Sequence, residues 1–334
     1  MLEKIQAFDL SKTWSFRIII AILVVYVGVS INELWIPECT ELGDCFDFDR
    51  RMARLAVWDF NWIDNDFRHV IHFGLLELSY QLFHNYKVLV LASSTLLLVV
   101  TYLFTVNMAE KRIAGILAVG IVLQSSIFYR YDTSVTYPSF WALLFVTSLY
   151  LNTTKSWHTS IIPYIFSIPA KAITALYMPG VLVFLWFKNR KAFKLFSVVS
   201  VIGLITVFSF TQLSEGDNGG FILINEIHVQ KFLGGFVSWM WQGFAEDQTT
   251  LLLLVVGGFL LFFNRKVIRN SNAMLPLVAG IILISPILTG MTTYSIWPYR
   301  MLPLVVLTAV MIGMLFANIG RIDLKMFQLN AKTK

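Results

Sequence analysis

Residues 87–106 read KVLVLASSTLLLVVTYLFTV, an apolar run that carries a single charge, Lys87, at its first position. A helix needs roughly 20 such residues to cross the hydrocarbon core of a bilayer, and this run has that length. Similar runs recur along the chain. We predict about ten membrane-spanning helices from them, at 14–31, 87–106, 113–129, 136–151, 157–169, 172–187, 195–211, 248–263, 273–290 and 300–317.

The composition agrees with a membrane protein. Of the 334 residues, 57% are hydrophobic and only 14% are charged, with a mean hydropathy of +0.70. Soluble domains have fewer apolar and more charged residues. The net charge of +6 comes from short basic clusters between apolar runs, so it does not indicate a nucleic-acid partner. The expected fold class is an all-α polytopic membrane protein, with residues 1–334 forming one transmembrane domain.

Basic clusters set the expected orientation. Lysines and arginines gather at 110–112, 188–191 and 264–269 and in the tail after 320. Because cytoplasmic loops are rich in Lys and Arg, we expect these segments and both termini to be cytoplasmic, in the cell membrane of a prokaryote or the endoplasmic reticulum of a eukaryote. That orientation requires an even number of spans before residue 188. Residues 70–84 are therefore predicted to lie along the membrane surface, and the first helix to stay in the membrane as an anchor.

The loop after the first predicted span holds half of the acidic residues. Residues 32–86 contain ten of the twenty acids of the chain: Glu33, Glu38, Glu41, Asp44, Asp47, Asp49, Asp59, Asp64, Asp66 and Glu77. Both cysteines, Cys39 and Cys45, also lie there; they would form a disulfide in an oxidising compartment and remain free thiols in a reducing one. Residues 50–62 of this loop, and 232–244 of a second outer loop at 212–247, are predicted as interfacial helices.

Four charged residues fall near the outer ends of predicted spans: Arg130, Asp132, Lys171 and Arg300. Charges at membrane depth cost about 2.5–3.5 kcal/mol on insertion scales, so they are candidates for function. A carboxylate can take a proton from a hydroxyl or hold a divalent ion, and an arginine or lysine can bind a phosphate. We therefore expect a polar pocket for a substrate that has a phosphate at the interface and an apolar tail.

Five short motifs follow one another along the chain: FDFDRRMARLA at 46–56, IHFGLLE at 71–77, YRYD at 129–132, EIHVQKF at 226–232 and PYRMLPL at 298–304. In this order the chain resembles the membrane glycosyltransferases of the GT-C fold, in the branch that includes the protein O-mannosyltransferases and the lipid A aminoarabinose transferases. The resemblance extends from residue 14 to about residue 317. Two features depart from the family: the prolines expected in the second motif are absent, and Phe48 separates Asp47 from Asp49 where the family has an adjacent Asp–Glu pair.

The resemblance implies a glycosyltransferase that moves a sugar from a polyprenyl-phosphate donor to a protein, lipid or glycan acceptor on the non-cytoplasmic face. It implies that Asp47 or Asp49 takes the acceptor proton and that Asp132 is a second acid of the pocket. The expected ligands of the donor phosphate are Arg300, Lys171 and Arg130. The expected substrate-lining residues are His72, His228 and Lys231.

A metal requirement stays open at this stage. Mg²⁺ and Mn²⁺ prefer oxygen ligands, which the acidic loop supplies. No spacing in the chain is typical of an ion-binding loop, and the resemblance includes branches that work without metal. Two cysteines are too few for a structural zinc site.

Each candidate also has a structural interpretation. Asp132 can serve as a partner of Arg130, Arg300 as an interfacial anchor beside Tyr299, and His72 as a structural hydrogen-bonding group. Two other functions compete with the transferase. A lipid or solute transporter needs polar groups or broken helices near the bilayer midplane. A non-catalytic subunit of a membrane complex would keep the scaffold without the chemistry.

Overall fold

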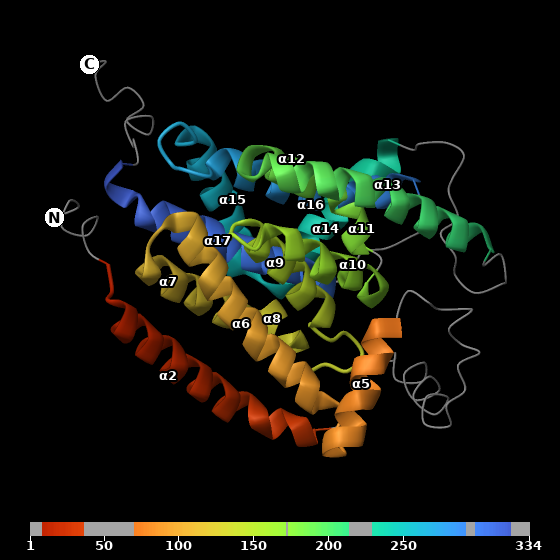
Figure 1. The fold of residues 1–334 in the computed structure, drawn as a ribbon, viewed down its shortest axis with the longest axis horizontal. Helices are drawn as coiled ribbons and strands as arrows, with labels where there is room; N and C mark the ends of the chain where they lie inside the picture. The colour runs from red at the N-terminus through yellow and green to blue at the C-terminus, as the bar shows by residue number, and fades with distance from the viewer. Residues whose placement is uncertain (1–8, 37–69, 172, 214–228, 292–297, 322–334) are drawn as a thin grey trace.

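The computed structural model describes residues 9–36, 70–171, 173–213, 229–291 and 298–321, and every regular element in these residues is a helix (Figure 1). The elements are α2 (Lys12–Ser30), η1 (Ile31–Trp35), α5 (Val70–Phe83), α6 (Lys87–Ala109), α7 (Arg112–Leu123), α8 (Ser126–Tyr131), α9 (Phe140–Asn152), η4 (Trp157–Ser160), α10 (Ile161–Ala170), α11 (Ile173–Leu176), α12 (Met178–Lys188), α13 (Arg190–Leu213), α14 (Val229–Glu246), α15 (Gln248–Phe263), α16 (Ser271–Met291), η5 (Pro298–Met301), α17 (Leu302–Ala317) and η6 (Ile319–Arg321).

Long apolar helices mark the chain as a candidate integral membrane protein. By length and composition, three helical segments of the described residues could cross a membrane: Lys12–Trp35, Lys87–Ala109 and Pro298–Ala317. Shorter apolar helices accompany them: Arg112–Leu123, Phe140–Asn152, Met178–Lys188, Gln248–Phe263 and Ser271–Ile284. The all-helical architecture is therefore confirmed, whereas ten full-length spans are not shown.

Helix α17 forms the centre of the bundle. Residues 302–311 are all buried, and the helix runs between α7 and α15 (Figure 1). Its neighbours come close because small residues face one another. A Cβ on Gly313 would lie 2.5 Å from the Thr105 side chain and 3.0 Å from the carbonyl oxygen of Ala114. Close backbone approach of this kind is how helices associate where lipid removes the usual hydrophobic drive.

Helices α2 and α5 lie at the margin of the bundle. Helix α2 packs against α6 and α7 and keeps most of its surface exposed, at the lower edge in Figure 1. Helix α5 lies across the end of α6, and its Phe73 and Leu76 pack against Val90 and Phe140. The helix predicted at 70–84 is thus present, and its position along a membrane surface stays a prediction.

Two predicted spans are interrupted. The stretch 113–129 forms α7 and α8, because the Ser125 hydroxyl accepts a hydrogen bond from the Phe128 amide at 3.2 Å and starts a new helix. The stretch 172–187 forms α11 and α12, which part at Tyr177. The extended backbone at Lys171 falls between the predicted spans 157–169 and 172–187. Apolar composition alone does not reveal such breaks.

The predicted second outer loop, 212–247, contains the whole of helix α14 (Val229–Glu246). This helix covers the segment 232–244 and packs along α16. The expected helix is therefore present and belongs to the bundle, while an interfacial position stays a prediction.

One end of the bundle gathers the predicted cytoplasmic clusters, and we call it the basic end. Arg269 forms an ion pair with Glu110. Lys188 Nζ donates to Asn270 Oδ1 at 2.9 Å, and Asn270 Nδ2 donates to the Met108 carbonyl at 2.9 Å. These contacts bring the turns α6–α7, α12–α13 and α15–α16 together, as the positive-inside rule predicts for loops on one side.

Candidate functional site

The other end of the bundle is polar and aromatic, and we call it the tyrosine end. It comprises η1, α5, the start of α6, the connection between α8 and α9, Lys171 and η5. Lys87 Nζ ties α6 to η1 by donating to the carbonyl oxygens of Glu33, at 3.1 Å, and Ile36, at 2.8 Å. Thr133 donates its hydroxyl to Glu33 Oε2 at 2.7 Å, which adds the α8–α9 connection.

Lys171 and Arg300 converge on one tyrosine ring. Arg300 lies in η5, has only 7% of its surface exposed, and donates from Nε to the Tyr299 hydroxyl at 3.0 Å. Its guanidinium carbon lies 5.2 Å from the centroid of the Tyr299 ring, and Lys171 Nζ lies 4.7 Å from the same centroid. Both distances are in the range of cation–π attraction. Two of the three predicted phosphate ligands therefore share a site.

Further tyrosines hold that ring in place. Tyr137 stacks on Tyr299 with ring centroids 4.1 Å apart, and Tyr131 meets both rings edge-on at 5.9 Å. Tyr177 donates its hydroxyl to the Arg300 carbonyl at 3.4 Å. Aromatic pairs of this geometry contribute about 0.5–1.5 kcal/mol each beyond their buried area. These contacts therefore stabilise the position of the Tyr299 ring beside the two cations.

A small pocket opens beside this cluster. Its empty volume is about 230 Å³, and it is lined by His72, Thr136, Tyr137, Pro138, Phe140, Trp141, Ala170, Lys171 and Tyr299. His72 Nε2 lies 3.0 Å from the Val135 carbonyl oxygen, so this histidine also joins α5 to the α8–α9 connection. The lining of this pocket therefore combines aromatic walls with one ammonium group and one imidazole.

Asp132 is buried and faces α2. Its Oδ2 accepts hydrogen bonds from the Tyr26 hydroxyl at 2.8 Å and the Ser30 hydroxyl at 3.1 Å, and the residue is 1% exposed. Its Oδ1 is buried and has no hydrogen-bond partner in the part of the chain that the structure describes. Burial raises the pKa of Asp132 to about 7; the Tyr26 hydrogen bond opposes this shift, and the charge of Glu33 adds to it.

Arg130 has a different partner. It forms an ion pair with Glu246 at the end of α14, and Ser126 donates its hydroxyl to the Glu246 carbonyl. The adjacent Asp247 is 5% exposed and caps α15 by accepting from the Thr250 amide at 2.9 Å. Neither acid was singled out in the sequence. An aspartate immediately before an apolar helix is an N-cap signal that could have identified Asp247.

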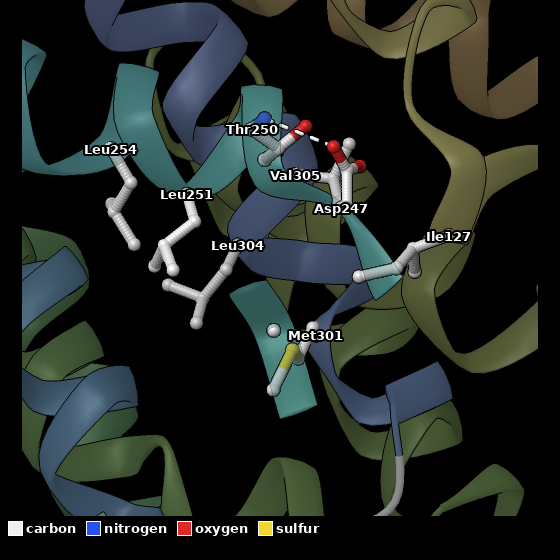
Figure 2. A pocket seen from close by; sticks show the side chains of 9 residues that line it. Ile127, Asp247, Thr250, Leu251, Leu254, Met301, Leu304 and Val305 are labelled. Atoms are coloured by element: carbon white, nitrogen blue, oxygen red, sulfur yellow. Dashed lines mark hydrogen bonds between the residues drawn. The ribbon is translucent and has the colours of Figure 1, made fainter. Parts of the chain in front are cut away.

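An apolar pocket lies between this capped turn and η5. Figure 2 shows the side chains of Leu251, Leu254 and Leu304 directed toward one open space, with Met301 across from them. The empty volume is about 310 Å³, and Asp247 and Thr250 are the polar lining residues. Met301, which lines this apolar space, directly follows the buried Arg300 in the sequence.

The predicted pocket residues thus divide into neighbouring groups. Lys171, Arg300 and His72 surround the tyrosine cluster, Asp132 is bonded to α2, and Arg130 is paired with Glu246. Asp47, Asp49, Cys39, Cys45 and His228 lie outside the described residues, as does the predicted helix at 50–62. Lys231 lies on α14, and its side chain is outside the description. Among the described residues no group of three or more His, Cys, Asp and Glu side chains could hold a metal ion.

Comparison of the chain with protein families, curated proteins and solved structures finds no match.

Proposed function

We propose that the chain is a membrane glycosyltransferase that takes a sugar from a polyprenyl-phosphate donor at the tyrosine end. In this proposal the scaffold is of the GT-C type with about ten spans, and the acceptor is a protein, lipid or glycan on the non-cytoplasmic face. The observation that carries it is the convergence of Lys171 and Arg300 on the Tyr299 ring, beside one apolar and one aromatic pocket.

The positive charges of Lys171 and Arg300 favour a phosphate beside Tyr299. Arginine presents a planar set of donors that matches phosphate oxygens, and the low dielectric around a guanidinium with 7% exposure strengthens the interaction. When the bond between sugar and phosphate breaks, the electron pair stays on the phosphate oxygen. Two fixed cations would stabilise that developing charge, which is often the largest contribution to catalysis.

The pockets support the two ends of such a donor. The apolar lining behind Met301 matches a hydrocarbon tail in chemistry, and the aromatic lining at His72 and Tyr137 matches a sugar ring. Both spaces are narrow, so each would have to widen to admit the donor. Asp47 or Asp49 would take the acceptor proton. We assign Asp132 a positioning role, because it fixes the α8–α9 connection that carries Tyr137.

A second candidate is a non-catalytic subunit on the same scaffold. It is favoured by the enclosure of Asp132 and by the pairing of Arg130 with Glu246, which are the contacts of structural groups. Binding of the donor lipid separates the two candidates, since a subunit without chemistry has no need for a polyprenyl-phosphate site.

The test measures binding of a polyprenyl phosphate to the purified protein and to the variants Lys171→Gln and Arg300→Lys. We expect Lys171→Gln to weaken binding on the order of tenfold, because a charge-assisted hydrogen bond contributes about 1.5–3 kcal/mol. Arg300→Lys keeps the charge and loses the paired donors, and it should weaken binding by a similar factor. Lys155→Gln, an exposed lysine at the basic end, is the matched control and should bind as the wild type does. Equal binding by all four proteins would contradict the proposal.

A further inference from the structure

The basic end has a charge balance unlike the rest of the molecule. The turn α12–α13 carries exposed Arg190 and Lys191, and the turn α15–α16 carries exposed Arg265, Lys266 and Arg269. The acids that the described residues place at this end, Asp9 and Glu110, are already ion-paired with Arg112 and Arg269. The remaining basic groups therefore give this surface an excess of positive charge.

Two of these arginines lie on exposed aromatic rings. The Arg190 guanidinium carbon is 4.8 Å from the Trp186 ring centroid, and that of Arg265 is 4.7 Å from the Phe262 centroid. Trp186 is 46% exposed and Phe262 is 47% exposed. Phe187 and Phe263 beside them are also exposed, so each turn presents apolar rings next to cations. Tryptophan and phenylalanine next to arginine are typical of the level where headgroups meet acyl chains.

The two turns are held next to each other. Lys188, at the end of α12, donates to Asn270, the residue before α16, at 2.9 Å, and α12 packs along α16. Figure 1 shows the two turns side by side at the same end of the bundle. These contacts hold together the two turns that carry the exposed rings and cations, and we call these residues the basic patch: Trp186, Phe187, Arg190, Lys191, Phe262 and Arg265.

We infer that this patch binds the headgroups of anionic phospholipids in the leaflet that it faces. The guanidinium groups match the phosphate of a headgroup, and the neighbouring rings match the first carbons of its acyl chains. A free phosphate would use only the first of these features, which is why the patch favours a lipid. The inference does not depend on the proposed transferase activity, because it concerns the opposite end of the molecule.

The experiment places the purified protein in mixed micelles of phosphatidylglycerol and phosphatidylcholine and measures retained lipid by native mass spectrometry. The test variant is Arg190→Gln with Arg265→Gln. The control variant is Lys12→Gln with Lys155→Gln, which removes the same charge from exposed lysines at the same end but outside the two turns. A third variant, Arg190→Lys with Arg265→Lys, keeps the charge. Comparing it with the test variant distinguishes a loss of lipid contacts from a folding defect.

We expect the wild type to retain phosphatidylglycerol in preference to phosphatidylcholine, and the test variant to lose this retention on the order of tenfold. The control variant should change by less than about twofold. The lysine variant keeps the charge but loses the paired guanidinium donors, so it should retain less lipid than the wild type and more than the test variant. Equal loss in test and control variants would show that total charge alone attracts the lipid, and would overturn the inference. No preference in the wild type, or displacement of the lipid by inorganic phosphate, would overturn it as well.

Discussion

At the scale of single residues, Asp132 shows how a carboxyl group is accommodated in an apolar bundle. It takes hydrogen bonds from Tyr26 and Ser30, yet one of its oxygens is buried without a partner among the described residues. A buried carboxyl is less costly when it is neutral, which is why its pKa lies near 7 rather than near 4. Between about pH 4 and about pH 7, the folded chain therefore holds a proton on Asp132 that the unfolded chain releases.

This proton makes stability depend on pH. Because the pKa of Asp132 is higher in the folded chain, its contribution to the free energy of unfolding is largest below about pH 4 and falls as pH rises to about 7. We expect Asp132→Asn to remove a fall of roughly 2–4 kcal/mol over that interval. The measurement is the thermal unfolding midpoint in detergent between about pH 4 and about pH 8. Parallel curves for the wild type and the variant would show that Asp132 does not titrate in this range.

The sequence predicts which residues form the site better than it predicts which residues they contact. Arg300, Lys171 and His72 were singled out because charged and polar side chains are rare in apolar runs, and the structure brings these three together. The contact of Asp132 with Tyr26 and that of Arg130 with Glu246 each join segments more than a hundred residues apart. Such pairs depend on helix packing, and no local spacing contains that information.

At the scale of elements, helices α12 and α16 cross where two glycines meet. A Cβ on Gly280 would lie 2.8 Å from the Cα of Gly180 and 3.2 Å from its backbone nitrogen. Real Cβ atoms do not approach a backbone atom this closely, so the crossing needs glycine at position 280. A Cβ on Gly180 would be less crowded, 3.1 Å from the Leu277 carbonyl oxygen. The same crossing fixes the relation of the turns α12–α13 and α15–α16 at the basic end.

Substitution at this crossing should separate the two helices. We expect Gly280→Ala to lower the free energy of unfolding by about 1–3 kcal/mol, as overpacking usually does. Gly258→Ala in α15 is the matched control, because nothing lies within 4 Å of the added Cβ. The control should be neutral or slightly stabilised, since alanine is the better helix former. Chemical or thermal unfolding in detergent measures both, and equal stability of the two variants would contradict the crossing.

The predicted ends of helices agree with the structure only where an apolar run forms one continuous helical segment. The run at 87–106 became α6 with three more residues at its end, and the run at 300–317 became η5 and α17. The run at 113–129 broke at Ser125, where a hydroxyl caps a new helix, and the run at 172–187 broke at Tyr177 into α11 and α12. Hydropathy is insensitive to such local turns, which is why these two breaks were missed.

At the scale of the whole molecule, the two ends differ in charge and therefore in expected location. The basic end should face the cytoplasm and the tyrosine end the opposite side. In a background with Cys39→Ser and Cys45→Ser, an impermeant maleimide should label Gln81→Cys on α5 in intact cells. It should label Lys266→Cys, in the turn α15–α16, only after permeabilisation. The reverse pattern would invert the topology and place the proposed site on the cytoplasmic side.

We propose that the tyrosine end binds a lipid phosphate, and covalent labelling can locate the bound lipid on the chain. A polyprenyl phosphate with a photoreactive group next to the phosphate is irradiated with the protein, and labelled peptides are mapped by mass spectrometry. We predict labels in α5, the α8–α9 connection and the segments around Lys171 and η5, suppressed by unlabelled polyprenyl phosphate but not by phosphatidylglycerol. Labels confined to the basic end, or labels at the tyrosine end that phosphatidylglycerol removes equally well, would contradict the claim.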